Sequence, residues 1–403
     1  MTPSPGPRRA AVAFIFVTVL LDMMALGLII PVLPHLVIEF MGADMGEAAH
    51  VYGLIGTLWA LMQFAFSPLI GALSDRFGRR PVVLLSNFGL GLDYILMAMA
   101  PNLAWLFVGR ALSGITSASI STAHAYIADV TPPEGRAGKF GLLGVAFGLG
   151  FVLGPAIGGM LGTEDPRLPF WVAAGLSLAN ACYGFFVLPE SLPPERRAPF
   201  AWTRANPFGS LVLLRAHAHL FGMASILFLQ NLAHVALPAA FVLYTAHRYG
   251  WDAGTTGITL AAVGICSMIV QGGLVRPAVR RFGERRALIA GLLAGAAGFA
   301  IYGLAPTAML FWMGLPVMAL WGLAAPALQG LMTQRVAATE QGRLQGANAS
   351  LMGIGAMIGP TLFTKTFAFF IAGAAPFALP GAPFLLASLL LLAGAALALR
   401  HAR

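Results

Sequence analysis

Long apolar stretches alternate with short polar or Pro- and Gly-rich breaks along almost the whole chain. A helix needs about 20 predominantly apolar residues to cross a bilayer. Twelve stretches meet this requirement, near residues 10–35, 51–73, 82–100, 103–128, 138–161, 168–188, 219–246, 254–278, 287–304, 307–333, 342–371 and 382–399. Lipid offers backbone polar groups no partner, and runs such as LLASLLLLAGAALAL do not alternate as barrel strands do. The pattern therefore predicts an all-α membrane protein with twelve transmembrane helices.

Composition supports the same class. Of the 403 residues, 58% are apolar and 10% are charged, whereas about a quarter of the residues in soluble domains are charged. The two cysteines, Cys182 and Cys266, lie inside apolar stretches and indicate neither a disulfide nor a metal site. We also find no nucleophile–base pair or phosphate loop, so we expect a protein that is not an enzyme.

The basic residues predict the orientation. Twenty of the 24 lie on one side of the predicted spans, in the two termini, the linker and alternate loops. Only Arg167 and Arg248 lie on the other side, and Arg110 and Lys365 lie inside spans. This asymmetry places both termini in the cytoplasm of a bacterial-type inner membrane. Because the cations are dispersed, the net charge of +9 does not indicate binding to nucleic acid.

The two halves of the chain repeat. The segment DRFGRRPVVL (75–84) is echoed by RRFGERRALI (280–289), and the Gly-Pro pair at 154–155 is echoed at 359–360, both with an offset of 205 residues. We predict a six-helix bundle over 1–188, a cytoplasmic linker over 189–218 and a second bundle over 219–403. Parallel repeats of this kind are typical of secondary transporters, whose substrate site lies near the middle of the membrane.

Several segments carry a family resemblance. GALSDRFGRR (71–80) resembles the signature loop of the major facilitator superfamily, and GVAFGLGFVLGPAIGG (144–159) resembles the drug/proton antiporter motif of that superfamily. LLDMMALGLIIPVLP (20–34), SNFGLGLDY (86–94), GRALSGIT (109–116), AYIAD (125–129) and PALQG (326–330) are similar to the tetracycline-efflux branch. The resemblance implies the twelve-helix fold of that superfamily and transport by alternating access.

Three charged residues lie deep inside the predicted spans of the first half: Asp22, Asp93 and Arg110. Asp22 lies 13 residues after Arg9 and Asp93 lies 13 residues after Arg80, so each is about 20 Å from the interface at 1.5 Å per residue. Asp93 and Arg110 are also level across the hairpin that joins their helices. A charge at this depth costs about 2.5–3.5 kcal/mol, so we expect a polar cavity in which a carboxylate exchanges protons. The alternative is an ion pair that only locks the helices together.

The resemblance implies that these three positions belong to the transport pathway. The second half departs from the tetracycline-efflux branch, because Ser267 stands where that branch has a histidine and Gly295 where it has an aspartate. Proton coupling would then rest on Asp22 and Asp93, and the departure weighs against a magnesium ion accompanying the substrate. We expect no cofactor other than the coupled proton.

Neutral polar residues inside the spans are candidates for binding substrate. Gln230 and His234 share a helix face, with Asn231 beside them, and Gln63 and Gln329 lie in other spans. Hydrogen bonding between helices is the competing explanation for all five. Lys365, near the outer end of its span, is expected to extend to the interface.

Candidate gating residues lie in the two motifs. Asp75, Gly78, Arg79 and Arg80 belong to the signature loop, which in the superfamily holds the cytoplasmic ends of the two halves together in one state. In the fifth span, glycines 150, 154 and 158 form one stripe that allows close helix packing, and Pro155 weakens the helix beside Gly154. Tight packing alone is the alternative for this stripe.

Together these features predict a proton-coupled antiporter that exports an amphiphilic, drug-like or tetracycline-like solute. We expect it to work as a monomer with protons, the small-molecule substrate and the lipid bilayer as its partners. A uniporter or importer of another small amphiphilic solute with the same fold is the alternative. A sugar fits less well, because its hydroxyl groups need more polar partners than the spans provide.

Overall fold

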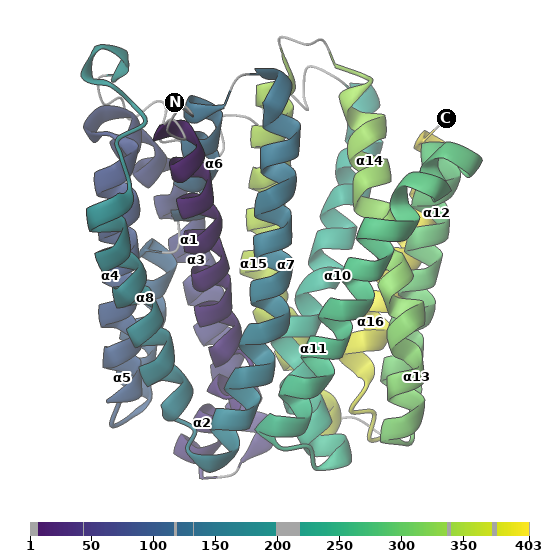
Figure 1. The fold of residues 1–403 in the computed structure, drawn as a ribbon. Coiled ribbons are helices and arrows are strands. Elements are labelled where there is room, and N and C mark those ends of the chain that lie inside the picture. Colours follow the sequence, from purple (N-terminus) through teal and green to yellow (C-terminus); the bar gives the residue numbers. More distant parts are fainter. Residues whose placement is uncertain are drawn as a thin grey trace. The chain divides into compact units, whose positions relative to one another are not determined.

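The structure is a computed structural model that describes residues 7–42, 44–116, 119–131, 133–198, 218–336, 340–372 and 377–402. Those residues form helices and no strand, which confirms the all-α prediction (Figure 1). The helices are α1 (Pro7–Ile29), α2 (Leu33–Phe40), α3 (Met45–Phe77), α4 (Arg79–Ala98), α5 (Leu103–Thr116), α6 (Ser119–Val130), α7 (Pro133–Glu164), α8 (Leu168–Val187), α10 (Ala218–Tyr249), α11 (Ala253–Ile269), α12 (Val275–Leu304), α13 (Ala308–Ala319), α14 (Ala324–Thr333), α15 (Gln341–Ile371) and α16 (Ala382–His401). Short helical turns are η1 (Pro194–Arg196), η3 (Val270–Leu274) and η4 (Leu320–Leu323).

Ten described helical runs are long and apolar enough to cross a membrane. One of them, Ala253–Leu304, is 52 residues long and contains two of the predicted spans, because α11, η3 and α12 follow one another without a break. The predicted span at 103–128 is divided into α5 and α6. The helices thus correspond to the predicted twelve, although their ends differ. Most of the predicted linker, residues 199–217, lies outside the described residues.

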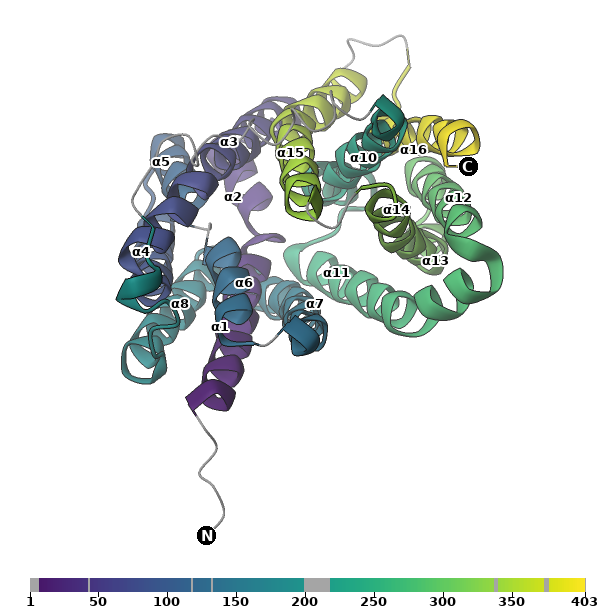
Figure 2. The ribbon, with the colours of Figure 1, turned by 90° about the horizontal axis from the view of Figure 1, so that it is seen from above.

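The chain forms two compact units. Unit 1 consists of Met1–Leu36, Leu58–Pro207 and Ala253–Ala261, and unit 2 consists of Val37–Thr57, Phe208–Asp252 and Ala262–Arg403. In unit 1, α1 packs on α7 and α8, and α4 packs on α5 and α8 (Figure 2). In unit 2, α12 packs on α13, α14 and α16, and α10 packs on α15 and α16. The proposed division of the chain at residues 188 and 218 stays a prediction.

Glycines bring α7 very close to α1. A Cβ atom at Gly154 would lie 2.7 Å from the Cα of Gly27, and one at Gly158 would meet the backbone of Leu28. Pro155 packs with its ring against Gly27, and α7 continues as a helix through this proline. The predicted close helix approach is therefore present, and its partner is α1.

The repeated loops share a backbone feature. Gly78, between α3 and α4, has a φ angle of +107°, and Gly283, at a kink inside α12, has a φ angle of +79°. Side chains with a Cβ atom rarely adopt these angles. The two glycines are 205 residues apart, which is the offset of the sequence repeat.

Aromatic side chains fill the part of unit 2 where α10 and α12 end. The rings of Tyr302 and Phe311 stack with centroids 4.1 Å apart. The Tyr244 hydroxyl donates to the carbonyl of Tyr302 at 2.7 Å, and the Tyr249 hydroxyl donates to the carbonyl of Ala305 at 2.8 Å. These bonds satisfy the polar tips of large buried rings and fix α10 against α12.

Candidate functional site

Asp93 and Arg110 face each other across the hairpin of α4 and α5. Asp93 is 1% exposed, and neither of its carboxylate oxygens has a hydrogen-bond partner of good geometry among the described residues. The Ser113 hydroxyl lies close enough for a weak hydrogen bond, and the Arg110 guanidinium is near the same carboxylate. Gly109 leaves room for it, because a Cβ atom there would lie 3.0 Å from an Asp93 oxygen. The hairpin thus keeps an acid and a guanidinium together away from solvent.

Arg110 also contacts α3. Its guanidinium lies over the ring of Trp59, 5.3 Å from the ring centroid. Gly114, one turn further along α5, packs against the carbonyl of Trp59, so the two helices approach closely here. A cation over an aromatic face is stabilised by the ring quadrupole, by about 2 kcal/mol when water is excluded. Trp59 therefore helps to hold Arg110 beside Asp93.

Asp22, on α1, is 7% exposed and contacts α8. The side-chain amide of Asn180 donates to an Asp22 carboxylate oxygen at 3.2 Å. The same amide group also bonds Thr18, whose hydroxyl donates to the Asn180 side-chain oxygen at 3.2 Å. Asn180 is completely buried on α8, and these bonds hold its side chain against Thr18 and Asp22 of α1.

Tyr94 lies near all three predicted charges. This side chain is 2% exposed and lies within electrostatic range of Asp22, Asp93 and Arg110. All three charges therefore lie in the interior of unit 1 near one aromatic hydroxyl. Their roles in proton coupling stay a prediction, but their proximity agrees with the depth count from the sequence.

The candidates on α10 divide between interior and surface. Gln230 is 5% exposed, and its side-chain oxygen has no hydrogen-bond partner in the described part of unit 2. His234, one turn later, is exposed, and its ring lies 5.6 Å from that of Trp321. Asn231 donates its amide to the carbonyl of Leu227 in its own helix at 2.8 Å. Gln230 and His234 thus remain the candidates with groups available to a ligand.

The other two glutamines differ from each other. Gln329 accepts a hydrogen bond from the Asn348 amide at 3.1 Å, which joins α14 to α15, as the packing alternative expects. Gln63 is half-buried on α3, in unit 1, beside Gly114 of α5. The structure places Gln63 in a different unit from the remaining four candidates.

Gly295 has a structural reason to lack a side chain. A Cβ atom there would lie 2.7 Å from the ring of Trp321. Trp321 also packs on Phe299 of α12, with ring centroids 5.5 Å apart, and on His234. An aspartate at position 295 would need Trp321 to move. At this position, where the sequence departs from the tetracycline-efflux branch, the Trp321 ring fills the space that an aspartate side chain would need.

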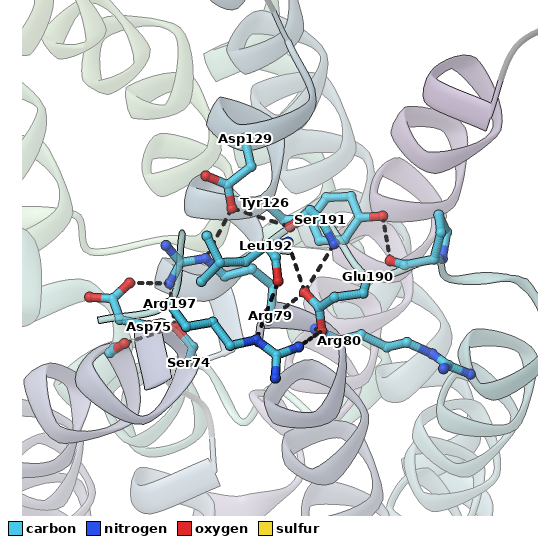
Figure 3. A network of polar contacts seen from close by, with 12 residues as sticks. Ser74, Asp75, Arg79, Arg80, Tyr126, Asp129, Glu190, Ser191, Leu192 and Arg197 are labelled. Carbon is cyan, nitrogen blue, oxygen red and sulfur yellow. Dashed lines mark hydrogen bonds and ion pairs between the residues drawn. The ribbon is translucent and has the colours of Figure 1, made fainter. Parts of the chain in front are cut away.

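The signature loop forms a polar network inside unit 1 (Figure 3). Arg79 forms an ion pair with Asp75 and another with Asp129 at 3.1 Å, and its guanidinium donates to the Ser74 hydroxyl at 2.6 Å. Arg80 donates to the carbonyl of Phe185 at 2.6 Å. These contacts connect α4 to α3 and α6 through Arg79 and to α8 through Arg80. Their predicted gating role stays a prediction.

Glu190 is a residue that sequence reasoning missed. Its carboxylate accepts from the backbone N–H groups of Arg79 at 2.9 Å and Arg80 at 3.3 Å, and thereby caps the first turn of α4. The same carboxylate accepts from the N–H groups of Ser191 and Leu192. A Cβ atom at Gly78 would collide with it. No local pattern reveals this cap, because Glu190 lies more than a hundred residues from the helix that it stabilises.

Asn180, Tyr94 and Trp59 were also missed. Each is uncharged, so its presence in a span has no large cost that would mark it, and only the rotation of its helix directs it to a charged partner. Lys365 is exposed on α15 and borders a groove of about 640 Å³ with Thr57 and Phe369. The described residues contain no group of three His, Cys, Asp or Glu side chains that could hold a metal ion.

Charged side chains held inside a helical bundle that is apolar enough to lie in lipid are typical of membrane transporters. The family model described as Major Facilitator Superfamily matches residues 15–360. The chain belongs to the major facilitator superfamily, and it is a transporter rather than an enzyme.

Similar proteins support this assignment. The tetracycline resistance protein, class C, of Escherichia coli is 40% identical over 361 residues, which are 89% of this chain and 90% of that protein. The class B protein of Escherichia coli is 37% identical over 347 residues, which are 86% of each chain. The crystal structure of the human organic anion transporter MFSD10 (TETRAN) is 25% identical, with a TM-score of 0.73, and the match covers 98% of this chain and 100% of that chain.

Proposed function

We propose that this transporter is a proton-coupled antiporter that exports an amphiphilic, tetracycline-like solute. It would act as a monomer in a bacterial inner membrane, with both termini in the cytoplasm. Proton entry down its gradient would drive alternating access. The basic-residue asymmetry supports the orientation, and the tetracycline resistance proteins among its relatives support the type of solute.

The environment of Asp93 carries the proposal. A buried carboxylate that has only the Ser113 hydroxyl as a nearby donor is costly when ionised, and a nearby guanidinium offsets that cost. Asp93 can therefore be neutral when Arg110 is turned away and ionised when Arg110 is near. A proton exchanged at this position would change the charge of the bundle interior and bias one conformation over the other.

Asp22 would support the same step from α1. It accepts a hydrogen bond from the Asn180 amide, which supports its ionised form. Tyr94 is close enough to both acids to interact electrostatically with either carboxylate. We propose Asp93 as the group that exchanges the coupled proton and Asp22 as a fixed negative charge of the pathway.

Unit 2 would bind the substrate with neutral groups. Tetracycline-like molecules are polycyclic, and the rings of His234 and Trp321 offer stacking surface, while the Gln230 amide can donate or accept a hydrogen bond. The described residues contain no group of three His, Cys, Asp or Glu side chains for a bound metal ion, and position 295 of α12 is a glycine, so we propose that the solute travels without magnesium.

The test is transport in proteoliposomes with an acidic interior. The wild-type protein should accumulate tetracycline inside, in exchange for protons, and Asp93→Asn should abolish this accumulation. Asp165→Asn, at an exposed loop position of the same unit, is the control and should transport normally. Protein-free liposomes correct for passive distribution of the drug.

Counterflow separates loss of coupling from loss of folding. Labelled tetracycline should still exchange for unlabelled tetracycline through Asp93→Asn, because exchange needs no net proton movement. Normal accumulation by Asp93→Asn would refute the coupling role of this acid. Accumulation that is equal with and without a pH gradient in the wild-type protein would favour a uniporter. Repeating the assay with magnesium chelated tests the metal-free proposal.

A further inference from the structure

The first part of α12 is rich in arginine. Five arginines lie between residues 276 and 286, and a surface groove of about 460 Å³ is lined by Arg276, Pro277, Arg280 and Arg281. Arg281 lies over the ring of its neighbour Phe282 at 5.8 Å. None of the three arginines of the groove forms an ion pair or hydrogen bond with any residue that the structure describes.

The acid within this segment does not neutralise them. The Glu284 carboxylate accepts a hydrogen bond from the Gln334 amide at 3.0 Å and lies against Gly330 of α14. It is therefore directed toward α14 rather than into the groove. Three guanidinium groups around one hollow repel each other, and an anion between them would remove that repulsion.

The first repeat shows what the second one lacks. There, Arg79 pairs with Asp75, and the Glu190 carboxylate fills the space beside Gly78. In the second repeat, Arg280 stands at the position of Asp75, so an acid is replaced by a base. Beside Gly283, nothing described comes within 4 Å of where a Cβ atom would lie. A protein carboxylate thus occupies the first loop, whereas the corresponding place beside Gly283 is open and the preceding turn of α12 carries Arg280 and Arg281.

We propose that this groove, defined by Arg276, Arg280 and Arg281, binds the phosphate group of an anionic phospholipid in the adjoining leaflet. Guanidinium groups match phosphate oxygens with paired hydrogen bonds. The neighbouring side chains indicate a lipid rather than a soluble phosphate, because Ile269 and Phe282 are 62% and 54% exposed and would contact acyl chains. The site is independent of the solute that the protein transports.

The test measures lipid binding by the full-length protein in detergent, with native mass spectrometry as the readout. The wild-type protein should retain phosphatidylglycerol in preference to phosphatidylcholine. Each basic residue near an anionic lipid surface contributes a factor of about five in affinity. The triple variant Arg276→Gln, Arg280→Gln, Arg281→Gln should therefore bind phosphatidylglycerol about a hundredfold more weakly.

Arg76→Gln is the matched control. Arg76 is the repeat counterpart of Arg281 and lies over Phe77 at 5.1 Å in the same way, but it does not line this groove. It should leave phosphatidylglycerol binding unchanged. Arg280→Asp restores the acid of the first repeat and should weaken binding more than Arg281→Gln does. Size-exclusion chromatography identifies variants that do not fold. If the triple variant does not fold, the comparison of Arg280→Asp with the wild-type protein tests the proposal by itself.

Three outcomes would overturn the proposal. The first is equal phosphatidylglycerol binding by the wild-type protein, the triple variant and Arg280→Asp. The second is equal binding of phosphatidylcholine, which would mean that acyl chains alone adhere to the surface. The third is displacement of the lipid by millimolar inorganic phosphate, which would assign the groove to a soluble anion.

Discussion

Glu190 illustrates how one side chain stabilises a loop that the sequence identifies only by its motif. Its carboxylate accepts hydrogen bonds from four backbone N–H groups. It lies at the N-terminus of α4, where the helix dipole favours a negative charge. It also explains why position 78 is glycine, because any side chain there would meet the carboxylate. The signature loop thus depends on a residue outside the motif.

Removing this cap should destabilise the protein. Glu190→Ala leaves the first N–H groups of α4 without their acceptor and should lower the free energy of unfolding by about 1–2 kcal/mol. Thermal unfolding of the purified protein in detergent measures the change. Glu195→Ala removes an exposed acid from the same segment and should have no effect. A similar loss for both variants would mean that net charge, rather than the cap, is responsible.

Trp321 is the residue that we expect to affect substrate affinity. It occupies the space above Gly295 and contacts His234. Trp321→Ala should raise the KM for tetracycline export about two- to tenfold, since a lost stacking pair costs about 0.5–1.5 kcal/mol. Initial export rates at several drug concentrations measure this. A change in maximal rate with KM unaltered would place Trp321 outside the binding surface.

At the residue scale, the buried charged residues could be predicted from the sequence better than the neutral residues that contact them. Asp22, Asp93 and Arg110 could be predicted because a charge in an apolar span is rare and its depth follows from helix rise. Asn180 and Tyr94 could not, because an amide or a phenol in a span has no such cost, and its partner depends on helix rotation. The shared face of Gln230 and His234 also did not predict that one would be buried and the other exposed.

At the scale of helices, glycine allows α7 to pack directly against α1. Gly150 and Gly158 contact the α1 backbone at Leu20 and Leu28, and Gly154 meets Gly27, so two helices approach without side chains between them. The stripe was readable from its spacing of four residues. Its partner was not, because small residues show which face can pack closely but not which helix will use it.

This packing predicts a difference between glycines of the same helix. Gly158→Ala places a Cβ atom against the backbone of Leu28, which cannot move as a flexible side chain can, and should cost about 1–3 kcal/mol. Gly144→Ala, where nothing described lies within 4 Å, should be neutral or stabilising. Unfolding temperature and yield of folded protein compare the two variants. Equal tolerance of both would contradict the close contact.

Helix boundaries were predicted less well than helix existence. The run Ala253–Leu304 appears as one apolar stretch because α11 continues through η3 into α12, although Arg276 to Arg286 separate two spans in the sequence. The arginines lie within α12 itself, whose backbone departs from helical geometry at Gly283. Charge marks where a span leaves the lipid, whereas backbone geometry decides where a helix ends, and the two need not coincide.

At the scale of the whole molecule, the two repeats share a backbone feature in their loops but differ in the charges that they carry. Both loops turn at a glycine with positive φ, 205 residues apart. Unit 1, however, contains the buried acids Asp22 and Asp93, whereas the core of unit 2 that is described contains neutral polar and aromatic groups. We infer that duplication supplied the fold and that the two units then took different tasks, proton exchange in the first and substrate binding in the second.

The most direct measurement is proton movement driven by the substrate itself. Liposomes that contain the purified protein and a trapped pH indicator are exposed to an inward tetracycline gradient without any imposed pH difference. The wild-type protein should make the interior more alkaline as protons leave in exchange for the drug, and Asp93→Asn should carry labelled tetracycline in counterflow without this change. An equal proton flux through Asp93→Asn would contradict the assignment of the coupled proton to this acid.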